Sequence, residues 1–210
     1  MPYRKRRYKR RRKYGKKRST RAIAFKALKI GKQLKAGVEH KFHDVVGSTT
    51  SLDFNGLLVD CNNIPIGTGD VSNRIGDKIF VTNMSVALYF EGVGQPIQWG
   101  GTVMRYKGLN TSASIADVYA YQGFAQAPVS PKTHDGRFLS KILFKTVKNT
   151  TAIMQTQNAF KRIRVMKSIN FNAGGTTTID NNALYLVLIN DLAVAGGNVR
   201  WMIRLHYVDM

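Results

Sequence analysis

Hydrophobic and polar residues alternate with a period of two along much of the chain after residue 38. The apolar residues fall on even positions in KIFVTNMSVALYFEG (78–92), with Thr82 as the exception. The same alternation occurs in FKRIRVMKSINF (160–171) and in VRWMIRLHYVDM (199–210). Such a pattern is typical of β-strands that are buried on one face only. The expected inward residues are Phe80, Met84, Val86, Leu88 and Phe90; Ile163, Val165, Ile169 and Phe171; and Val199, Trp201, Ile203, Leu205 and Tyr207.

Further strands are expected between these segments. The run ALYLVLIN (183–190) is continuously apolar and too short for a typical helix, which predicts a central strand covered on both faces. The other candidate strands are 39–46, 51–60, 98–106, 117–122 and 138–148. Glycine-containing turn signals separate them, namely Asn55-Gly56, Gly67-Thr68-Gly69-Asp70, Gly76-Asp77, Gly100-Gly101, Gly174-Gly175 and Gly196-Gly197-Asn198. Long loops are expected at about 61–77 and 107–136. Many strands without a convincing helix between them indicate an antiparallel sandwich or barrel.

Charge divides the chain into two parts. Residues 1–41 contain 18 basic residues and one acid, Glu39, which gives a net charge of +17. Residues 42–210 contain 15 basic and 11 acidic residues, which gives a net charge of only +4. A like-charge block this dense repels itself and buries too little apolar surface to fold alone. We therefore predict a disordered basic arm at 1–37 and one globular domain at 38–210.

The first part of the arm, residues 1–21, is rich in Arg and Tyr. Thirteen of these 21 residues are Lys or Arg, and Tyr3, Tyr8 and Tyr14 interrupt them. Cations displace counterions from phosphates and spaced aromatics stack on bases, so the segment favours binding of single-stranded nucleic acid without sequence readout. A solubilising tail or a nuclear localisation signal alone is the alternative. The predicted contacts are Arg4, Lys5, Arg6, Arg7, Tyr8, Lys9, Arg10, Arg11, Arg12, Lys13, Tyr14, Lys16, Lys17, Arg18 and Arg21.

The second part, residues 22–37, is Lys-rich and amphipathic. Its apolar residues share one face at helical spacing, but Gly31 weakens a helix by about 1 kcal/mol relative to Ala. The segment is at best a marginal helix. It could order on nucleic acid, or lie on a membrane surface. The predicted nucleic-acid contacts here are Lys26, Lys29, Lys32 and Lys35.

Catalytic chemistry is sparse in this sequence. Cys61 is the only cysteine, which excludes an intrachain disulfide or a multi-cysteine zinc site, and a small buried apolar side chain is the better interpretation. His40 and His43 lack the partners of a metal site, and the glycine clusters match no phosphate-binding motif. We expect no enzymatic activity, cofactor or metal. There is no apolar run long enough for a transmembrane helix and no secretory signal, so no stable membrane association is expected.

A second basic set lies on the strands of the domain. Its members are Arg162, Arg164, Lys167, Arg200 and Arg204, opposite the apolar faces of their strands. They are either ordinary polar residues of a solvated face or an extension of the phosphate-binding surface on the side where the arm emerges.

The layout resembles the capsid proteins of small circular, Rep-encoding single-stranded DNA viruses, the circovirus- and geminivirus-like group. The resemblance rests on the Tyr/Arg/Lys-rich start, on RIGDKIFVTNMSVALYFEG (74–92) with an R-x-G-[DN]-x-[IV] pattern, and on the closing VRWMIRLHYVDM. The matched positions are Arg74, Gly76, Asp77 and Ile79, then Arg200 to Tyr207. A Cys/His zinc-finger-like motif assigned to some geminivirus coat proteins cannot form here, because the chain has one cysteine.

The resemblance implies an eight-stranded jelly roll of two four-stranded sheets that assembles as a small icosahedral shell around circular single-stranded DNA. It also implies an inward-facing arm that doubles as a nuclear import signal. Partners would be other copies of the chain, single-stranded nucleic acid and host nuclear import receptors, with the protein in the virion and in the host nucleus. A polycation reads phosphate in DNA and RNA alike, so only the resemblance favours DNA.

Overall fold

The structure, a computed structural model, describes residues 39–67, 70–108, 113–119, 128, 140–151, 155–172, 179–194 and 196–210. Over these ranges the chain forms nine β-strands and a short 3-10 helix. The strands are β1 (Lys41–Thr49), β2 (Leu57–Asp60), β3 (Lys78–Glu91), β4 (Ile97–Tyr106), β5 (Ser140–Thr150), β6 (Thr156–Phe171), β7 (Ile179–Asn181), β8 (Ala183–Asn190) and β9 (Asn198–Asp209). The 3-10 helix η2 spans Ile115–Asp117.

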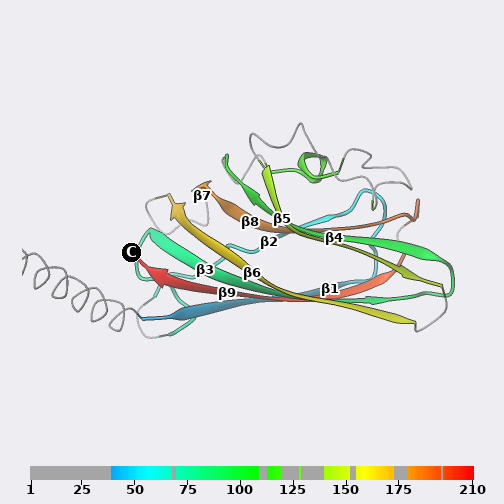
Figure 1. The fold of residues 1–210 in the computed structure, drawn as a ribbon, viewed down its shortest axis with the longest axis horizontal. Coiled ribbons are helices and arrows are strands. Elements are labelled where there is room, and N and C mark those ends of the chain that lie inside the picture. Colours follow the sequence, from blue (N-terminus) through cyan, green and yellow to red (C-terminus); the bar gives the residue numbers. More distant parts are fainter. Residues whose placement is uncertain are drawn as a thin grey trace, which may run out of the picture. The chain divides into compact units, whose positions relative to one another are not determined.

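The strands pair antiparallel in two sheets. The first sheet has the order β1-β9-β3-β6-β7, and the second has the order β2-β8-β4-β5. Figure 1 shows β1, β9, β3 and β6 in one layer and β2, β8, β4 and β5 in the other. Along the chain, successive strands change sheet at every step except β4 to β5 and β6 to β7. This strand order is that of a jelly roll, which confirms the predicted all-β antiparallel sandwich, with β7 as a short strand beyond the eight expected.

A β-bulge in β3 explains the exception at Thr82. The register shifts at this residue, so the strand carries one extra residue relative to β9. Ile79 is buried before the bulge, and the even positions from Met84 to Phe90 are buried after it. Phe80, predicted to point inward, is only half-buried. The predicted face is therefore correct after the bulge and wrong before it.

The outer face of the second sheet is covered by the loop that follows β4. A Cβ atom on Gly100 would lie 2.9 Å from the hydroxyl oxygen of Tyr119 and 3.2 Å from the Cα atom of Pro128. The hydroxyls of Tyr119 and Thr102 share a buried hydrogen bond of 2.7 Å, and burial raises the pKa of Tyr119 to about 12. All eight residues of β8 are buried, which confirms the prediction that this strand is covered on both faces.

The predicted strand 51–60 is shorter than expected. Asp53 accepts hydrogen bonds at Oδ1 from the backbone nitrogens of Asn55 (2.8 Å) and Gly56 (3.2 Å). Gly56 has a φ of 81°, a left-handed conformation that suits glycine. This side-chain turn ends the extended backbone, and the strand β2 begins only at Leu57.

The predicted strand 117–122 is wrong at its start. Ser114 accepts a hydrogen bond at its side chain from the backbone nitrogen of Ala116, and its own nitrogen donates to Asp117 (2.8 Å). This reciprocal capping stabilises the start of the 3-10 helix η2, which includes the first residue of the expected strand. Residues 120–122 lie outside the described residues, as does most of the loop between β4 and β5. The predicted loop 61–77 is confirmed, because it spans the connection from β2 to β3.

The whole arm, residues 1–37, lies outside the described residues, so the predictions for its two parts stay predictions. Among the described residues, no helix has the length and apolar composition needed to cross a membrane.

Candidate nucleic-acid interface

The outer face of the first sheet carries four parallel rows of side chains. Cross-strand pairing places one residue from each of β1, β9, β3 and β6 in every row. In that strand order the rows are Ser48, Arg200, Tyr89 and Asn158; Val46, Met202, Ala87 and Phe160; Asp44, Arg204, Ser85 and Arg162; and Phe42, His206, Asn83 and Arg164. We call this surface the row face.

Four of the five strand-borne basic residues predicted as a set meet on the row face. They are Arg162, Arg164, Arg200 and Arg204. Lys167 does not join them, because it pairs with the buried Val81 beyond a register shift in β6. The alternation in the sequence predicts that each arginine points away from the core on its own strand. In the sheet order, β9 and β6 lie on either side of β3, so the arginines of β9 and β6 share one surface.

Arg204 is already paired. Its Nε and Nη2 atoms donate to Oδ1 and Oδ2 of Asp44, both at 2.7 Å, and its guanidinium lies 4.6 Å from the ring centroid of Phe42. The hydrogen bond from Arg204 lowers the pKa of the Asp44 carboxyl. Arg204 thus serves the β1–β9 contact, which leaves Arg162, Arg164 and Arg200 as the exposed cations of the row face.

His206 lies among these charges. Burial lowers the pKa of its imidazole first, and the cations Arg162 and Arg204 lower it further, whereas Asp44 raises it. Burial also lowers the pKa of His43, which is partly offset by Asp44.

Because of these two histidines, we expect the stability of the domain to fall in mild acid. Their folded pKa values lie below the ordinary 6.5, so the unfolded chain binds more protons in the interval just below pH 6.5. The free energy of unfolding should therefore fall as pH drops through that interval, well above the range where Asp44 titrates. Urea unfolding between pH 7.5 and 5 measures this, and His43→Gln/His206→Gln should flatten the dependence. His40→Gln is the comparison variant: the charge of His40 also lowers the pKa of His206, so its removal should flatten the dependence less than the double substitution does. An unchanged pH dependence in the double variant contradicts the prediction.

The second row is apolar and exposed. Val46 is 70% exposed, Phe160 is 72% exposed and Met202 is 43% exposed. With Tyr89 and Arg200 of the next row, these residues line a shallow depression of about 670 Å³. The guanidinium of Arg200 lies 5.8 Å from the ring centroid of Tyr89. This row was not predicted from the sequence. Its signal there is a set of apolar residues at positions where the alternation requires polar ones.

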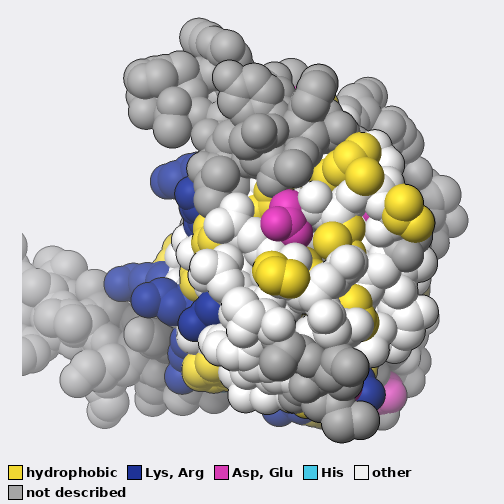
Figure 2. Space-filling model, turned by 90° about the vertical axis from the view of Figure 1, so that its right-hand side faces the viewer, with side chains coloured by type: hydrophobic (Ala, Val, Ile, Leu, Met, Phe, Trp, Pro, Cys, Tyr) yellow, Lys and Arg dark blue, Asp and Glu magenta, His cyan; other side chains and the backbone are white. Residues whose placement is uncertain are grey.

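A second basic surface follows the sandwich edge where β5 and β6 lie in contact. Both strands carry exposed lysines, Lys141 and Lys145 on β5 and Lys161 and Lys167 on β6, in addition to Arg162 and Arg164 of the row face. Figure 2 shows Lys and Arg gathered along one side of the view, with mostly hydrophobic and uncharged side chains on the end facing the viewer. Charged side chains also protect an edge strand against pairing with another chain.

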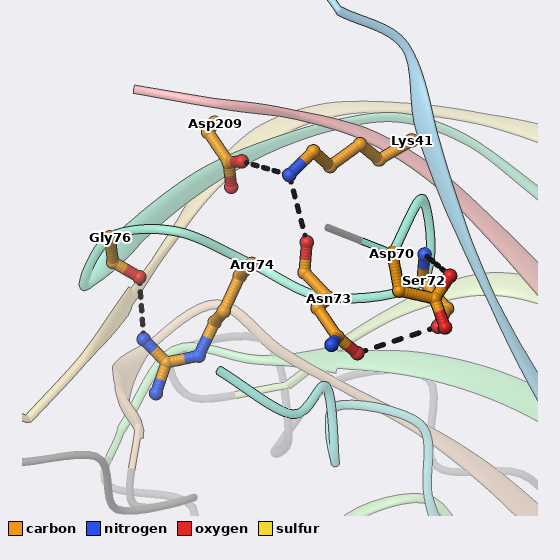
Figure 3. Close-up of polar contacts among 7 residues, drawn as sticks. All are labelled: Lys41, Asp70, Ser72, Asn73, Arg74, Gly76 and Asp209. Carbon is orange, nitrogen blue, oxygen red and sulfur yellow. Dashed lines mark hydrogen bonds and ion pairs between the residues drawn. The ribbon is translucent and has the colours of Figure 1, made fainter. Parts of the chain in front are cut away.

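Of the R-x-G-[DN]-x-[IV] residues, Arg74 and Ile79 are buried, whereas Asp77 is 53% exposed. Arg74 is 1% exposed, donates through Nη1 to the Gly76 oxygen at 2.5 Å and contacts Asp77 at 3.3 Å. Its guanidinium lies 4.0 Å from the ring centroid of Phe171. Figure 3 shows Arg74 in this loop, with Lys41 nearby. The motif therefore fixes the loop that leads into β3.

Lys41 ties the start of β1 to this loop and to the last strand. Its Nζ atom donates to the Asn73 oxygen at 3.0 Å and pairs with Asp209 at 2.9 Å, and the side chain is 3% exposed (Figure 3). The last basic residue of the +17 segment is thus part of the domain and is not available to nucleic acid.

The prediction that Cys61 is a small buried apolar side chain is confirmed. The residue is fully buried, and burial together with Asp60 raises the pKa of its thiol. In the described residues, no group of three or more His, Cys, Asp or Glu side chains is placed to hold a metal ion.

No protein-family model and no curated protein matches this chain. Among solved structures, it is similar to a chain of the infectious bursal disease virus Gx strain, with 10% identity and a TM-score of 0.28 over 81% of this chain and 37% of that one. A chain of the Macrobrachium rosenbergii nodavirus shows 9% identity and a TM-score of 0.21, over 81% of this chain and 58% of that one. A mutant VP2 protein of infectious bursal disease virus, in T=1 particles, shows 9% identity and a TM-score of 0.19, over 81% and 40%. This chain therefore covers less than two thirds of each. All three TM-scores lie below 0.5, so these similarities carry no functional argument.

Proposed function

We propose that this chain is a viral capsid protein whose jelly-roll domain self-assembles into a small icosahedral shell and whose arm packages single-stranded nucleic acid. The role is structural, with no enzymatic activity, cofactor or metal. The cargo is circular single-stranded DNA, a choice that rests on the family resemblance alone.

The observation that carries the proposal is the division of charge. The arm, residues 1–37, holds 17 basic residues and no acid, whereas residues 38–210 hold 16 basic and 12 acidic residues. A segment of this charge binds phosphates by counterion release without reading sequence, as a packaging arm must. It is joined to a jelly roll, an architecture that viral capsid domains use.

The row face supports the same proposal. The arm continues into β1, which is an edge strand of the first sheet. The row nearest the start of β1 contains His206 and Arg164, and the next row contains Arg162. The row face thus adds exposed arginines of the domain to the phosphate-binding residues predicted in the arm.

The arm also serves as a nuclear localisation signal in this proposal. Dense Lys/Arg clusters such as those between residues 4 and 18 suit nuclear import receptors. The protein would pass through the host nucleus during assembly and end in the virion.

The rival function is a monomeric nucleic-acid-binding protein of the ribosomal or architectural kind, with a basic tail on a β-domain. Size-exclusion chromatography and electron microscopy of the purified full chain separate the two. We expect closed particles of uniform diameter that protect copurifying nucleic acid from nuclease, and sequencing identifies that nucleic acid. A strict monomer over a range of salt and pH, with single-stranded DNA supplied, contradicts the capsid proposal.

A further inference from the structure

The row face combines features that suit a ligand with both apolar and anionic parts. Its second row exposes Val46, Met202 and Phe160. Arg200 lies in the row on one side, and Arg162 lies in the row on the other. Rows on one face of a sheet are two residues apart, about 7 Å, so the two basic rows lie about 13 Å from each other. An occupant must therefore place apolar groups in the middle and negative charge on both sides.

Single-stranded nucleic acid meets this description. Its unpaired bases offer flat apolar faces, and its phosphates alternate with the bases along the strand. Exposed aromatics on a β-sheet surface, with arginines beside them, are a general means of stacking unpaired bases. The shallow depression at Tyr89, Phe160 and Met202 offers such bases an open apolar surface beside Arg200.

A second copy of the chain suits the row face less well than single-stranded nucleic acid does. If two copies met through their row faces about a two-fold axis, each would bring the same exposed arginines to the contact. The acidic residue in the four rows is Asp44, and both of its oxygens already accept hydrogen bonds from Arg204. Like charges would face each other without counter-charges.

We propose that the row face is a stacking site for unpaired nucleobases, with Phe160 and Tyr89 as the platforms and Arg200 and Arg162 as phosphate ligands. This inference rests on the proposed packaging function and deepens it. The arm holds phosphates whatever the bases are, whereas this site engages the bases themselves. It takes any unpaired base, because stacking tolerates all of them.

Photo-crosslinking of the full chain locates the site directly. The probe is an oligodeoxythymidylate carrying 5-iodouracil, and mass spectrometry of the digested adduct identifies the residue. We expect adducts at Phe160 or Tyr89 in addition to arm tyrosines, and loss of the β6 adduct in Phe160→Ala. Phe160 is 72% exposed, so the variant should fold. Adducts confined to residues 1–37 would overturn the inference.

Equilibrium binding gives the quantitative test. Fluorescence anisotropy compares the full chain's affinity for oligothymidylate with its affinity for an abasic strand of equal length. Phe160→Ala should lower that affinity ratio about fivefold or more, while the affinity for the abasic strand stays unchanged. Val194→Ala is the matched control, because Val194 is 79% exposed in the loop between β8 and β9.

The outcomes separate this inference from the proposed function. A chain that binds neither strand contradicts packaging itself. A chain that binds both strands and assembles, with the same ratio in Phe160→Ala and the parent, overturns only the stacking site. If Phe160→Ala instead blocks assembly of the protein without nucleic acid and leaves the ratio unchanged, the row face is an interface between copies and the inference is wrong.

Discussion

Deletion of residues 2–21 should remove most of the nucleic-acid affinity of this chain and leave its β-domain folded. The segment carries thirteen of the 33 basic residues and no acid. Each phosphate neutralised on a single strand contributes about 0.7 to the slope of log K against log salt. If all thirteen cations engage phosphates, the deletion should reduce that slope by about 9. At moderate salt the affinity should fall by several orders of magnitude.

Anisotropy titrations of a labelled oligonucleotide at a series of salt concentrations measure this slope. The matched control is a full chain in which residues 2–21 are shuffled, so that charge and aromatic content stay the same. Because phosphate contacts carry no base information, the shuffled arm should bind as the parent does. Circular dichroism and thermal unfolding should show the same domain in all three proteins. Retention of DNA by the deletion variant with an unchanged slope would show that the arm is not the binding element.

The strands of the domain could be predicted because burial on one face leaves a period-two pattern. That pattern places Ile163, Val165, Ile203 and Leu205 correctly in the core. It cannot reveal a single extra residue, so the predicted inward face of β3 is wrong before the bulge at Thr82 and correct after it. The alternation also does not reveal the side-chain turn at Asp53, because that turn depends on hydrogen bonds from the backbone nitrogens of Asn55 and Gly56 to one carboxylate.

The candidate site was predictable only in part, because it depends on which strands become neighbours. Alternation predicts that Arg162 and Arg200 point away from the core, and the sheet order then places them on one surface. The pairing of Arg204 with Asp44 joins residues 160 positions apart, and no local pattern indicates it. Phe160 was missed because one apolar residue at a polar position carries little signal until its row with Met202 and Val46 is assembled.

The second large effect is expected at the junction between the arm and the domain. Lys41→Met keeps the apolar stem of the side chain and removes its ammonium group. The Asp209 carboxylate, which is 21% exposed, then loses its ion pair, and the Asn73 oxygen loses its donor. Removing one partner of a buried pair leaves the other charge uncompensated, so we expect the free energy of unfolding to fall by about 2–4 kcal/mol. Urea unfolding of the full chain at neutral pH measures the change.

Two further variants separate the ion pair from charge in general. Lys145→Met removes an exposed lysine of β5 and should change the stability by less than about 0.5 kcal/mol. Lys41→Met/Asp209→Asn removes both charges, and its loss should be smaller than the two single losses added together. Additive losses would show that Lys41 and Asp209 do not interact energetically. With the pair intact, Lys41 holds the start of β1 to Asn73 in the loop before β3 and to Asp209 at the end of β9, so its loss should loosen all three segments together.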